Sequence, residues 1–392
     1  MSRPAIAIVS PVVRIGGGTE GVIAWILEAL KKDYTIYFIT TEQINLRLLN
    51  EAYGTNIKED EIKIIQVYIP FWLKNRFALL GGALLVRFCK RIARQFELML
   101  SAYNIMDFGK RGMQYIVDFS FDDRLRCFFD PVDRGLTRFF YRGFILRWIY
   151  LKLCELIAGT SKVDRWRNFT ITNSRWSKEV IKDNFGIEAK IIYHPVVSQS
   201  VNIPWEKREN GFISLSRLSP EKNIDKIIDI LSIVKKRGYD IHLHILGRID
   251  DTNYCKYLKQ LCESNKGWIF IEGLAIGNKK IEYLNQHKFG ISARRYEPFG
   301  IAIAEMVKSG CIVWVPDGGG QREIVNHPGL IYTDIGDAAN KIEQVLKNEE
   351  VQLNLRNHLA EQGKKFSSEK FMAEIREVVN EFFLKKGGAN ER

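Results

Sequence analysis

Short apolar runs alternate with segments of helical periodicity along most of the chain. Residues 5–10 read as a buried strand, a glycine-containing loop follows, and apolar positions from Val22 to Leu30 recur at the spacing of one helix face. A repeated order of strand, loop and helix is typical of a parallel α/β sheet, because crossover helices cover the faces of such a sheet. In the first half the pattern predicts further strands at 34–40, 62–69, 115–119, 127–129, 169–174 and 191–197.

The same alternation restarts after a polar segment at 198–210. There it predicts strands at 212–216, 241–247, 268–273, 289–292 and 312–316, with helices between them and, after Thr333, a helical region that runs to about Lys385. A chain of 392 residues exceeds one ordinary hydrophobic core. We therefore predict an α/β fold with two domains, at 1–198 and 211–365, joined by a linker at 199–210. Residues 366–392 are predicted to form a C-terminal helix that packs back on the first domain, followed by a frayed tail.

The composition describes a globular protein with an excess of positive charge. Apolar residues make up 46% and charged residues 27% of the chain, and the formal net charge is +12. Such a charge favours an anionic partner such as a nucleotide, an acidic lipid surface or a nucleic acid. No nucleic-acid-binding motif is present, so we expect no nucleic-acid partner.

Neither a signal peptide nor a transmembrane helix is predicted. Met1 to Pro4 lead directly into the first strand, and no stretch of about 18 uncharged apolar residues occurs. The six cysteines form no C-x-x-C pair and mostly lie in apolar segments, as buried free thiols do in a reducing compartment. We expect a cytoplasmic protein, with peripheral binding to the cytoplasmic face of a membrane as an open possibility.

Residues 71–100 combine apolar and basic side chains. No acidic residue occurs between Phe71 and Phe96, and basic residues flank the apolar run 77–86: Lys74, Arg76, Arg87, Lys90, Arg91 and Arg94. A basic amphipathic helix with aromatic residues at one end is typical of a helix that lies on an anionic membrane surface. An ordinary core helix with a solvated basic face fits the pattern equally well. A second aromatic and basic stretch, at 138–150, adds weight to the membrane interpretation.

Two glutamates frame the start of a predicted helix at 301–310. Glu297 precedes Pro298 and Gly300, and Glu305 lies about two turns further on. The free N–H groups at a helix start suit an anion such as a pyrophosphate, and Gly300 would let a ligand approach the backbone. The layout fits a nucleotide sugar whose hydroxyls hydrogen-bond to a carboxylate at each end. A surface helix with two solvated glutamates is the alternative.

Other candidate groups lie at the ends of predicted strands. Gly17 and Gly18 of the first glycine loop would bring backbone close to a ligand, or would serve a plain structural turn. Asp118 lies near the end of one predicted strand and Asp130 follows another, where α/β enzymes place catalytic groups. They are candidates for contacting an acceptor hydroxyl, and each also fits a turn or cap position.

His242 and His244 lie at alternate positions of the predicted strand 241–247 and therefore share one face of it. Imidazoles at this spacing can bind a transition metal, but a site requires further ligands. No third ligand is apparent in the sequence. Structural histidines are the preferred interpretation, and no metal site is predicted.

Four motifs occur together in order along the chain: Gly17-Gly-Thr-Glu20, Ser216-Arg-Leu-Ser-Pro-Glu-Lys-Asn223, Glu297 with Glu305, and Asp317-Gly-Gly-Gly-Gln-Arg-Glu323. As a set they resemble those of the retaining nucleotide-sugar glycosyltransferases of the GT4 type. The resemblance covers nearly the whole chain. It implies the GT-B fold, in which two Rossmann-like domains with parallel sheets face each other across a cleft.

The resemblance also implies roles for individual residues. Arg217 and Lys222 would hold the donor diphosphate as fixed cations, without a metal ion or other cofactor. Glu297 would bind the hydroxyls of the sugar, and Glu305 those of the ribose. The remaining donor-binding positions are Gly17, Gly18, Gly247 and the backbone of Phe299, Gly300 and Ile301, and the catalytic candidates are Glu297, Arg217, Lys222 and Asp130. Retention in the family is usually explained by same-face attack in which the donor phosphate takes the acceptor proton, so no protein nucleophile is expected.

The first half also resembles the subgroup that mannosylates lipid-linked oligosaccharides, through Cys127-Phe-Phe-Asp-Pro131, Thr172-Asn-Ser-Arg-Trp176 and Ile192-Tyr-His-Pro-Val196. We therefore expect transfer of a hexose, mannose in the first place, from GDP-mannose or a UDP-sugar to a lipid-linked or glycan acceptor at the membrane surface. The chain departs from the subgroup at Phe129-Asp130-Pro131, where those enzymes carry a histidine before a Tyr-Pro. The departure puts the acceptor chemistry in question. It also leaves open a catalytically idle GT-B protein that binds nucleotide or membrane as a scaffold.

Overall fold

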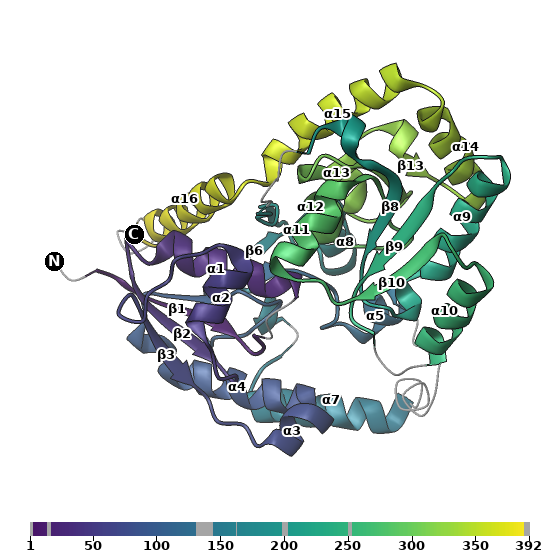
Figure 1. Ribbon diagram of the computed structural model, residues 1–392. Helices are drawn as coiled ribbons and strands as arrows, with labels where there is room; N and C mark the ends of the chain where they lie inside the picture. Colours follow the sequence, from purple (N-terminus) through teal and green to yellow (C-terminus); the bar gives the residue numbers. More distant parts are fainter. Residues whose placement is uncertain are drawn as a thin grey trace. The chain divides into compact units, whose positions relative to one another are not determined.

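The computed structural model describes residues 3–13, 17–130, 144–161, 163–197, 203–249 and 253–387. They form two compact units, and each is described by itself (Figure 1). Unit 1 contains the chain up to Asn173, residues Ser177–Pro195 and the chain from Ser368 onward. Unit 2 contains Val196–Ser367 and the short segment Ser174–Trp176. The chain therefore leaves unit 1 and returns to it.

Unit 1 is built on a seven-stranded parallel sheet in the order β3-β2-β1-β4-β5-β6-β7. Its strands are β1 (Ala5–Ser10), β2 (Thr35–Thr40), β3 (Ile62–Gln66), β4 (Leu98–Ser101), β5 (Met113–Ile116), β6 (Phe169–Thr172) and β7 (Lys190–Ile191). In β1, Ile6 and Ile8 enter one buried cluster, whereas Ala7 and Val9 enter another. Apolar side chains on both faces are what a parallel sheet covered by helices requires.

Helices cover both faces of this sheet. They are α1 (Gly18–Leu30), α2 (Leu46–Tyr53), α3 (Phe71–Arg76), α4 (Ala78–Ile92), α5 (Asp123–Phe129), α7 (Phe144–Ala158), α8 (Arg175–Phe185) and α16 (Ser368–Gly387), with the 3-10 turns η1 (Ala93–Gln95) and η2 (Asp164–Trp166). The cluster on the Ile6 face includes Leu27 of α1 and Phe371 of α16. The cluster on the opposite face includes Leu85 and Cys89 of α4. Both faces of the sheet are therefore closed.

The last helix completes the core of unit 1. α16 packs along α1, where Arg376 Nε donates to the carbonyl of Ala29 at 2.8 Å. Tyr34 Oη donates to Asn380 Oδ1, also at 2.8 Å. The buried apolar residues of α16 in this core are Phe371, Ile375, Val378, Val379 and Phe382. The apolar face of α1 is thus covered by a helix from the far end of the chain.

Unit 2 is built on a six-stranded parallel sheet in the order β10-β9-β8-β11-β12-β13. Its strands are β8 (Glu209–Leu215), β9 (His242–Leu246), β10 (Ile269–Gly273), β11 (His287–Ile291), β12 (Ile312–Pro316) and β13 (Ile331–Tyr332). Its helices are α9 (Ile224–Lys236), α10 (Asn253–Ser264), α11 (Gly277–Gln286), α12 (Ile301–Lys308), α13 (Gln321–Val325), α14 (Ile335–Leu346) and α15 (Glu349–Gly363). Its 3-10 turns are η3 (Trp205–Lys207), η4 (Pro220–Lys222), η5 (Pro328–Leu330) and η6 (Lys364–Phe366). Because the strands are parallel, the loops after β8 and β11 lie at the same edge.

Two parallel sheets with covering helices confirm the predicted α/β class, but the predicted strand at 127–129 is wrong. These residues end helix α5. The Asp122 carboxylate caps this helix, because it accepts hydrogen bonds from two N–H groups of the first turn at 3.0 Å each. Asp123 adds a negative charge at the same end. The cap and the helix dipole outweigh the β propensity of the phenylalanines, and Asp130 follows a helix instead of a strand.

The central strand β4 was missed by the sequence prediction. Residues 71–100, treated there as one segment, contain α3, α4, η1 and β4 in succession. β4 pairs with β1 on one side and β5 on the other, and all four of its residues are buried. Its sequence, Leu-Met-Leu-Ser, contains no β-branched residue and therefore carries a weak strand signal. The strand predicted at 191–197 is also shorter, since β7 covers only Lys190–Ile191.

Several sequence predictions fall partly outside the described residues. They concern 14–16 of the first glycine loop, 138–143 of the aromatic and basic stretch, 199–202 of the predicted linker and the tail beyond 387. The described part of the predicted linker contains η3, and strand β8 already starts at Glu209. Among the described helices, none is both long and apolar enough to span a bilayer.

Candidate active site

Three charged side chains meet at the carboxyl edge of the unit 2 sheet. Lys222 ends η4 after β8, and Arg294 and Glu297 lie in the loop after the neighbouring strand β11. Lys222 Nζ lies 2.7 Å, and Arg294 Nη1 3.1 Å, from the same carboxylate oxygen of Glu297. The side chains of Lys222, Arg294 and Glu297 are only 17%, 14% and 19% exposed. The edge of the sheet therefore holds one carboxylate between two cations.

The two cations set the ionisation of Glu297. Burial alone would raise the pKa of this carboxyl, but the charges of Lys222 and Arg294 outweigh it and lower the pKa to about 2. A carboxylate of this acidity is a weak base and a weak nucleophile, yet it still accepts hydrogen bonds. Glu297 is therefore suited to hold hydroxyl groups and poorly suited to take a proton from one.

Glu297 should make the unfolding free energy of the protein depend on pH in the acidic range. The ordinary pKa of about 4.5 applies in the unfolded chain, so the stabilisation from this group is complete above that pH and is lost as the pH falls toward 2. Between pH 7 and pH 3 we expect the wild-type protein to lose about 2 kcal/mol of unfolding free energy that Glu297→Gln does not lose. Urea denaturation of both proteins at the two pH values measures the difference. An equal loss in both would contradict the low pKa.

Glu305 has a different basic partner. It lies on α12, and its Oε1 is 2.7 Å from Nζ of Lys280 on α11. The Glu305 side chain is 20% exposed. Glu297 and Glu305 thus each accept a charged hydrogen bond in a half-buried setting, which does not fit two solvated surface glutamates.

Gly300 starts helix α12 in a conformation that favours glycine. Its φ is +105°, and a Cβ there would lie 2.8 Å from Ile303 Cδ1. Its carbonyl accepts the N–H of Ile303 at 3.0 Å, which opens the helix. The first N–H groups of a helix, including that of Ile301, have no carbonyl partner within the helix and suit an anion. The Phe299 side chain is 2% exposed and belongs to the core, so only its backbone can serve a ligand.

The second glycine loop, at 318–320, packs against the backbone that carries Glu297. Cβ atoms at Gly318, Gly319 and Gly320 would lie 2.6, 2.4 and 2.2 Å from the carbonyl oxygens of residues 295, 297 and 298, respectively. The N–H of Gly320 donates to the Glu297 carbonyl at 2.8 Å. These glycines let two loops touch backbone to backbone and fix the position of Glu297. A run of three glycines signals close packing in the sequence, but it does not reveal the partner.

The segment Ser174–Trp176 joins the same region of unit 2. Ser174 Oγ donates to the carbonyl of Pro298 at 2.7 Å. The Glu323 carboxylate accepts the first two N–H groups of α8, each at 3.0 Å, and thereby caps that helix. A carboxylate so far along the chain leaves no local signal that could have revealed it.

Arg217 and Gly247 lie at the same edge in different surroundings. The Arg217 side chain is 61% exposed, with Nη2 3.4 Å from Glu221 Oε1. An exposed guanidinium can move onto an anion without breaking a buried contact. The N–H of Gly247 donates to the carbonyl of Gly273 at 2.8 Å, and a Cβ at Gly247 would lie 1.6 Å from the Ser216 carbonyl oxygen. Gly247 thus allows the ends of β8 and β9 to approach, and its N–H already has a protein partner.

The predicted glycine positions of unit 1 stand at the carboxyl end of β1. Gly17 is the N-cap of α1, and its carbonyl accepts the Tyr53 hydroxyl at 2.7 Å. A Cβ at Gly17 would lie 2.3 Å from Glu20 Oε2, at the end of a side chain that can rotate away. Gly18 is the first residue of the helix.

The predicted acceptor carboxylates, also in unit 1, occupy a turn and a helix end. Asp118 Oδ1 accepts Asn104 Nδ2 at 2.7 Å, the N–H of Ser120 at 2.9 Å and its hydroxyl at 2.6 Å. Asp118 therefore organises the turn after β5. Asp130 stands at the C-cap of α5, where its N–H donates to the carbonyl of Arg126 at 2.9 Å.

Large apolar side chains are exposed on helices α3 and α7, which both pack on α4 in unit 1 (Figure 1). Six of them, named here the α3–α7 surface, are 60–80% exposed: Phe71, Trp72, Ile145, Leu146, Trp148 and Leu156. On α7 the exposed residues Ile145, Ile149, Leu153 and Leu156 recur at the spacing of one helix face. An exposed apolar helix face of this kind is a candidate interaction surface.

Residues 198–366 match the family model described as glycosyl transferases group 1. A GDP-Man:Man(3)GlcNAc(2)-PP-Dol alpha-1,2-mannosyltransferase from Eremothecium gossypii is 30% identical over 190 residues, which are 43% of this chain and 30% of that protein. The enzyme of the same name from Dictyostelium discoideum is 21% identical over 273 residues, 62% of this chain and 53% of that protein. The chain thus spans from 30% to 53% of the length of these curated relatives.

The likeness to solved structures extends over nearly the whole chain. HepE of Anabaena, solved in complex with UDP and glucose, has a TM-score of 0.67 at 16% identity, with 96% of this chain and 100% of that chain covered. At this identity the likeness concerns the fold, and it confirms the predicted GT-B architecture. Residues 198–366 therefore match the glycosyl transferases group 1 family, and the chain has the GT-B fold.

Proposed function

We propose that this protein transfers a hexose from a nucleotide-diphosphate sugar to an acceptor hydroxyl, with GDP-mannose as the first candidate donor and a UDP-sugar as the second. The observation that carries the proposal is the Glu297 carboxylate between Lys222 and Arg294 at the carboxyl edge of β8 and β11. The names of the two mannosyltransferase relatives support mannose. The UDP bound to HepE supports a UDP-sugar as the alternative.

The charged groups at this edge suit a departing diphosphate. As the bond between sugar and phosphate breaks, negative charge grows on the phosphate oxygens, and fixed cations stabilise it. We assign this role to Lys222 and to the exposed Arg217, whose planar guanidinium can bind two phosphate oxygens at once. The N–H groups that open α12 add positive partial charge. Because the protein itself supplies this charge, we propose that the step needs no metal ion.

Glu297 and Glu305 are assigned to the hydroxyls of the donor, Glu297 to those of the sugar and Glu305 to those of the ribose. The low pKa of Glu297 supports a positioning role over a nucleophilic one. In the proposed reaction the acceptor oxygen attacks the sugar on the face that the phosphate leaves. The new bond to the acceptor oxygen then forms as the bond to phosphate breaks, and the acceptor proton passes to a phosphate oxygen. This course retains the configuration of the sugar.

Donor turnover tests the proposal. Purified protein is incubated with GDP- and UDP-sugars, with and without a lipid-linked oligosaccharide, and the released nucleoside diphosphate is measured. Arg217→Ala is expected to lower turnover about tenfold through loss of a charged hydrogen bond to phosphate. Lys347→Ala is the matched control, because Lys347 is also 61% exposed and also pairs with a glutamate four residues away, Glu343. Absence of turnover with every donor, with nucleotide still raising Tm, would favour the idle scaffold.

We further propose that the acceptor is lipid-linked or a glycan and that the α3–α7 surface brings the protein to an anionic membrane. Exposed tryptophans beside aliphatic residues are typical of helices that lie in the headgroup region. Three nearby basic side chains already have acidic partners at 2.5, 2.8 and 2.7 Å: Lys74 with Glu42, Lys90 with Asp107, and Arg147 with Asp123. Part of the positive charge near this surface is therefore already paired. We expect insertion of the exposed apolar side chains to contribute more to the proposed membrane binding than the basic residues of 71–100 do.

Removing two tryptophans from the α3–α7 surface should weaken membrane binding. We expect Trp72→Ser/Trp148→Ser to bind vesicles of phosphatidylcholine and phosphatidylserine at least tenfold more weakly, because an inserted large apolar side chain contributes about 2 kcal/mol. Co-sedimentation measures the binding. Leu353→Ser is the control, since Leu353 is 51% exposed on α15 in unit 2. Equal binding of the double variant and the control would contradict the assignment, and equal binding to neutral vesicles would exclude an electrostatic contribution.

A further inference from the structure

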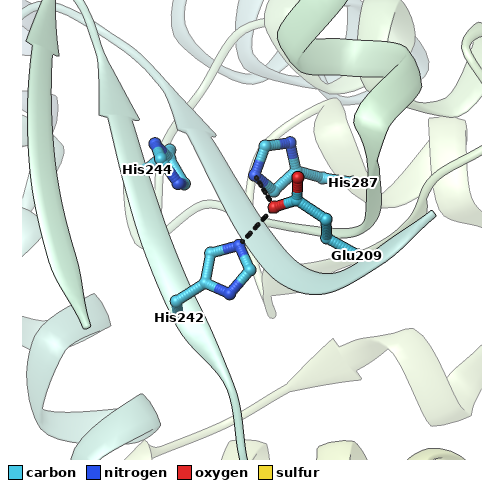
Figure 2. A group of neighbouring side chains, drawn as sticks. All are labelled: Glu209, His242, His244 and His287. Carbon is cyan, nitrogen blue, oxygen red and sulfur yellow. Dashed lines mark ion pairs between the residues drawn. The ribbon is translucent and has the colours of Figure 1, made fainter. Parts of the chain in front are cut away.

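Four potential metal ligands converge at the amino ends of three neighbouring strands of unit 2 (Figure 2). Glu209 begins β8, His242 begins β9, and His287 begins β11. His244 lies two residues after His242 on the same face of β9. One ligand atom of each residue lies within 4.8 Å of the others. From the sequence, no further ligand was apparent beside His242 and His244. In the structure the further candidates come from β8 and β11.

The distances approach those of a tetrahedral metal site. Nε2 of His242 lies 3.1 Å, and Nε2 of His287 3.7 Å, from Oε2 of Glu209. Figure 2 shows both rings directed toward this carboxylate. Around a tetrahedral zinc ion with bonds of about 2.0–2.1 Å, neighbouring ligand atoms are about 3.3–3.4 Å apart. Small side-chain rotations therefore suffice to bring these atoms onto one ion.

In two of the histidines, a ring nitrogen contacts a hydrogen-bond partner outside the cluster, as is usual for metal-binding histidines. Nδ1 of His287 is 2.7 Å from the carbonyl oxygen of Tyr283, and Nδ1 of His244 is 2.7 Å from Oε1 of Glu272. A carbonyl only accepts hydrogen bonds, so Nδ1 of His287 carries the proton and Nε2 presents a lone pair. Such outer carbonyl and carboxylate partners orient the ring and raise its basicity as a ligand.

Two of the inward-facing nitrogens face the Glu209 carboxylate. Nε2 of His242 and Nε2 of His287 are buried, and apart from Glu209 Oε2, at 3.1 and 3.7 Å, neither has a hydrogen-bond partner in the described part of the chain. The His287 side chain is only 1% exposed. The buried lone pair of His287 beside a carboxylate is an arrangement that a cation satisfies.

Gly211 makes room for these rings. It lies two residues after Glu209 on the same face of β8. A Cβ at this position would lie 2.2 Å from His242 Nε2 and 2.5 Å from His287 Cδ2. The imidazoles of His242 and His287 therefore pack directly against the backbone of β8, the central strand of the three.

We propose that Glu209, His242, His244 and His287 bind one divalent transition-metal ion, with Zn²⁺ as the preferred ion. Three imidazoles and one carboxylate are ligands that Zn²⁺ accepts, and four protein ligands complete a tetrahedron. The site lies at the amino edge of the sheet, whereas Lys222 follows the carboxyl end of β8. The ion joins the starts of β8, β9 and β11 and stabilises unit 2, without contact with the donor. The proposal is independent of the proposed sugar transfer.

Zinc titration of the full-length protein tests the site. The protein is treated with EDTA, dialysed and titrated with Zn²⁺ against a chromophoric zinc chelator, and Tm is measured with and without the ion. We expect one tightly bound Zn²⁺ per chain and a higher Tm. Loading with Co²⁺ should give the intense visible absorption of a tetrahedral site. Absence of both zinc binding and the cobalt spectrum in the wild-type protein overturns the proposal.

Ligand variants locate the binding. Glu209→Gln and His242→Asn remove one ligand each from side chains that are 52% and 26% exposed, so both are expected to fold. Zinc affinity should fall at least tenfold in the first and about a hundredfold in the second. His358→Gln is the control, because His358 Nε2 contacts the Val325 carbonyl outside the cluster. Wild-type affinity in both ligand variants overturns the proposal, and donor turnover of Glu209→Gln should equal that of the wild type.

Discussion

Replacement of Lys222 by methionine is expected to lower donor turnover by about 10²–10³-fold, as happens when one preorganised group is removed from a charge that grows in the transition state. Methionine keeps an unbranched apolar chain and removes only the ammonium group. Arg294 remains 3.1 Å from the Glu297 carboxylate, so the carboxylate stays paired and the protein should stay folded. The kcat for release of nucleoside diphosphate should carry most of the loss.

Two further variants make this result specific. Lys341→Met removes another half-buried lysine of unit 2, which is 24% exposed and pairs with Asp337 at 2.8 Å, and it should keep wild-type turnover. Lys222→Arg keeps the positive charge and should recover part of the activity. Equal turnover of Lys222→Met and Lys341→Met would contradict the assignment of Lys222 to the diphosphate.

Replacement of Gly247 by alanine is expected to destabilise the protein by more than about 4 kcal/mol. The new Cβ would lie 1.6 Å from the Ser216 carbonyl oxygen, and no side-chain rotation relieves a clash with backbone. The ends of β8 and β9 would have to separate, which breaks the 3.0 Å bond from the Ser216 N–H to the Leu246 carbonyl. Calorimetry should show the loss as a lower unfolding temperature or as failure to fold.

Gly82→Ala is the matched control for this experiment. Gly82 lies inside α4, and no atom would lie within 4 Å of its added Cβ. Alanine should stabilise the helix there by about 0.5–1 kcal/mol. If Gly247 served only to admit a ligand, Gly247→Ala would instead fold with wild-type stability and lose donor binding. The comparison therefore separates a packing role from a binding role.

Regular elements with strong local signals could be predicted from the sequence. The predicted bounds of β1 and β12 agree with the structure, because each is a short apolar run between turn residues. β4 could not be recognised, since its Leu-Met-Leu-Ser sequence follows an apolar helix without a turn signal. Residues of α5 form a helix because Asp122 caps its start, although the aromatic residues that follow favour a strand. Local propensity fails where a short-range polar contact outweighs it.

The charged cluster of Lys222, Arg294 and Glu297 could be anticipated in part from the sequence. Lys222 and Glu297 belong to motifs after two strands, and the sheet order brings those strands together, so the 2.7 Å contact follows from the fold. Arg294 lies in the same loop as Glu297, but a contact inside an irregular loop leaves no periodic pattern. The partner of the second glycine loop likewise depends on how two loops pack.

The histidine cluster illustrates the same limit over longer distances. The sequence places His242 and His244 on one face of a strand, and that prediction agrees with the structure. Glu209 and His287 lie far from them along the chain. Only the order β9-β8-β11 brings the starts of the three strands together, and strand order is not encoded in any local pattern.

The return of α16 to unit 1 determines the order in which the protein can mature on the ribosome. Residues 196–367 are synthesised between β7 and α16, which at about 5–20 residues per second takes about 10–30 s. During this interval the apolar face of α1 lacks Phe371 and Val379. Apart from Ser174–Trp176, unit 2 is one continuous stretch of chain. It can therefore complete its fold before unit 1 does. Nascent unit 1 therefore keeps this apolar face exposed until α16 has been synthesised.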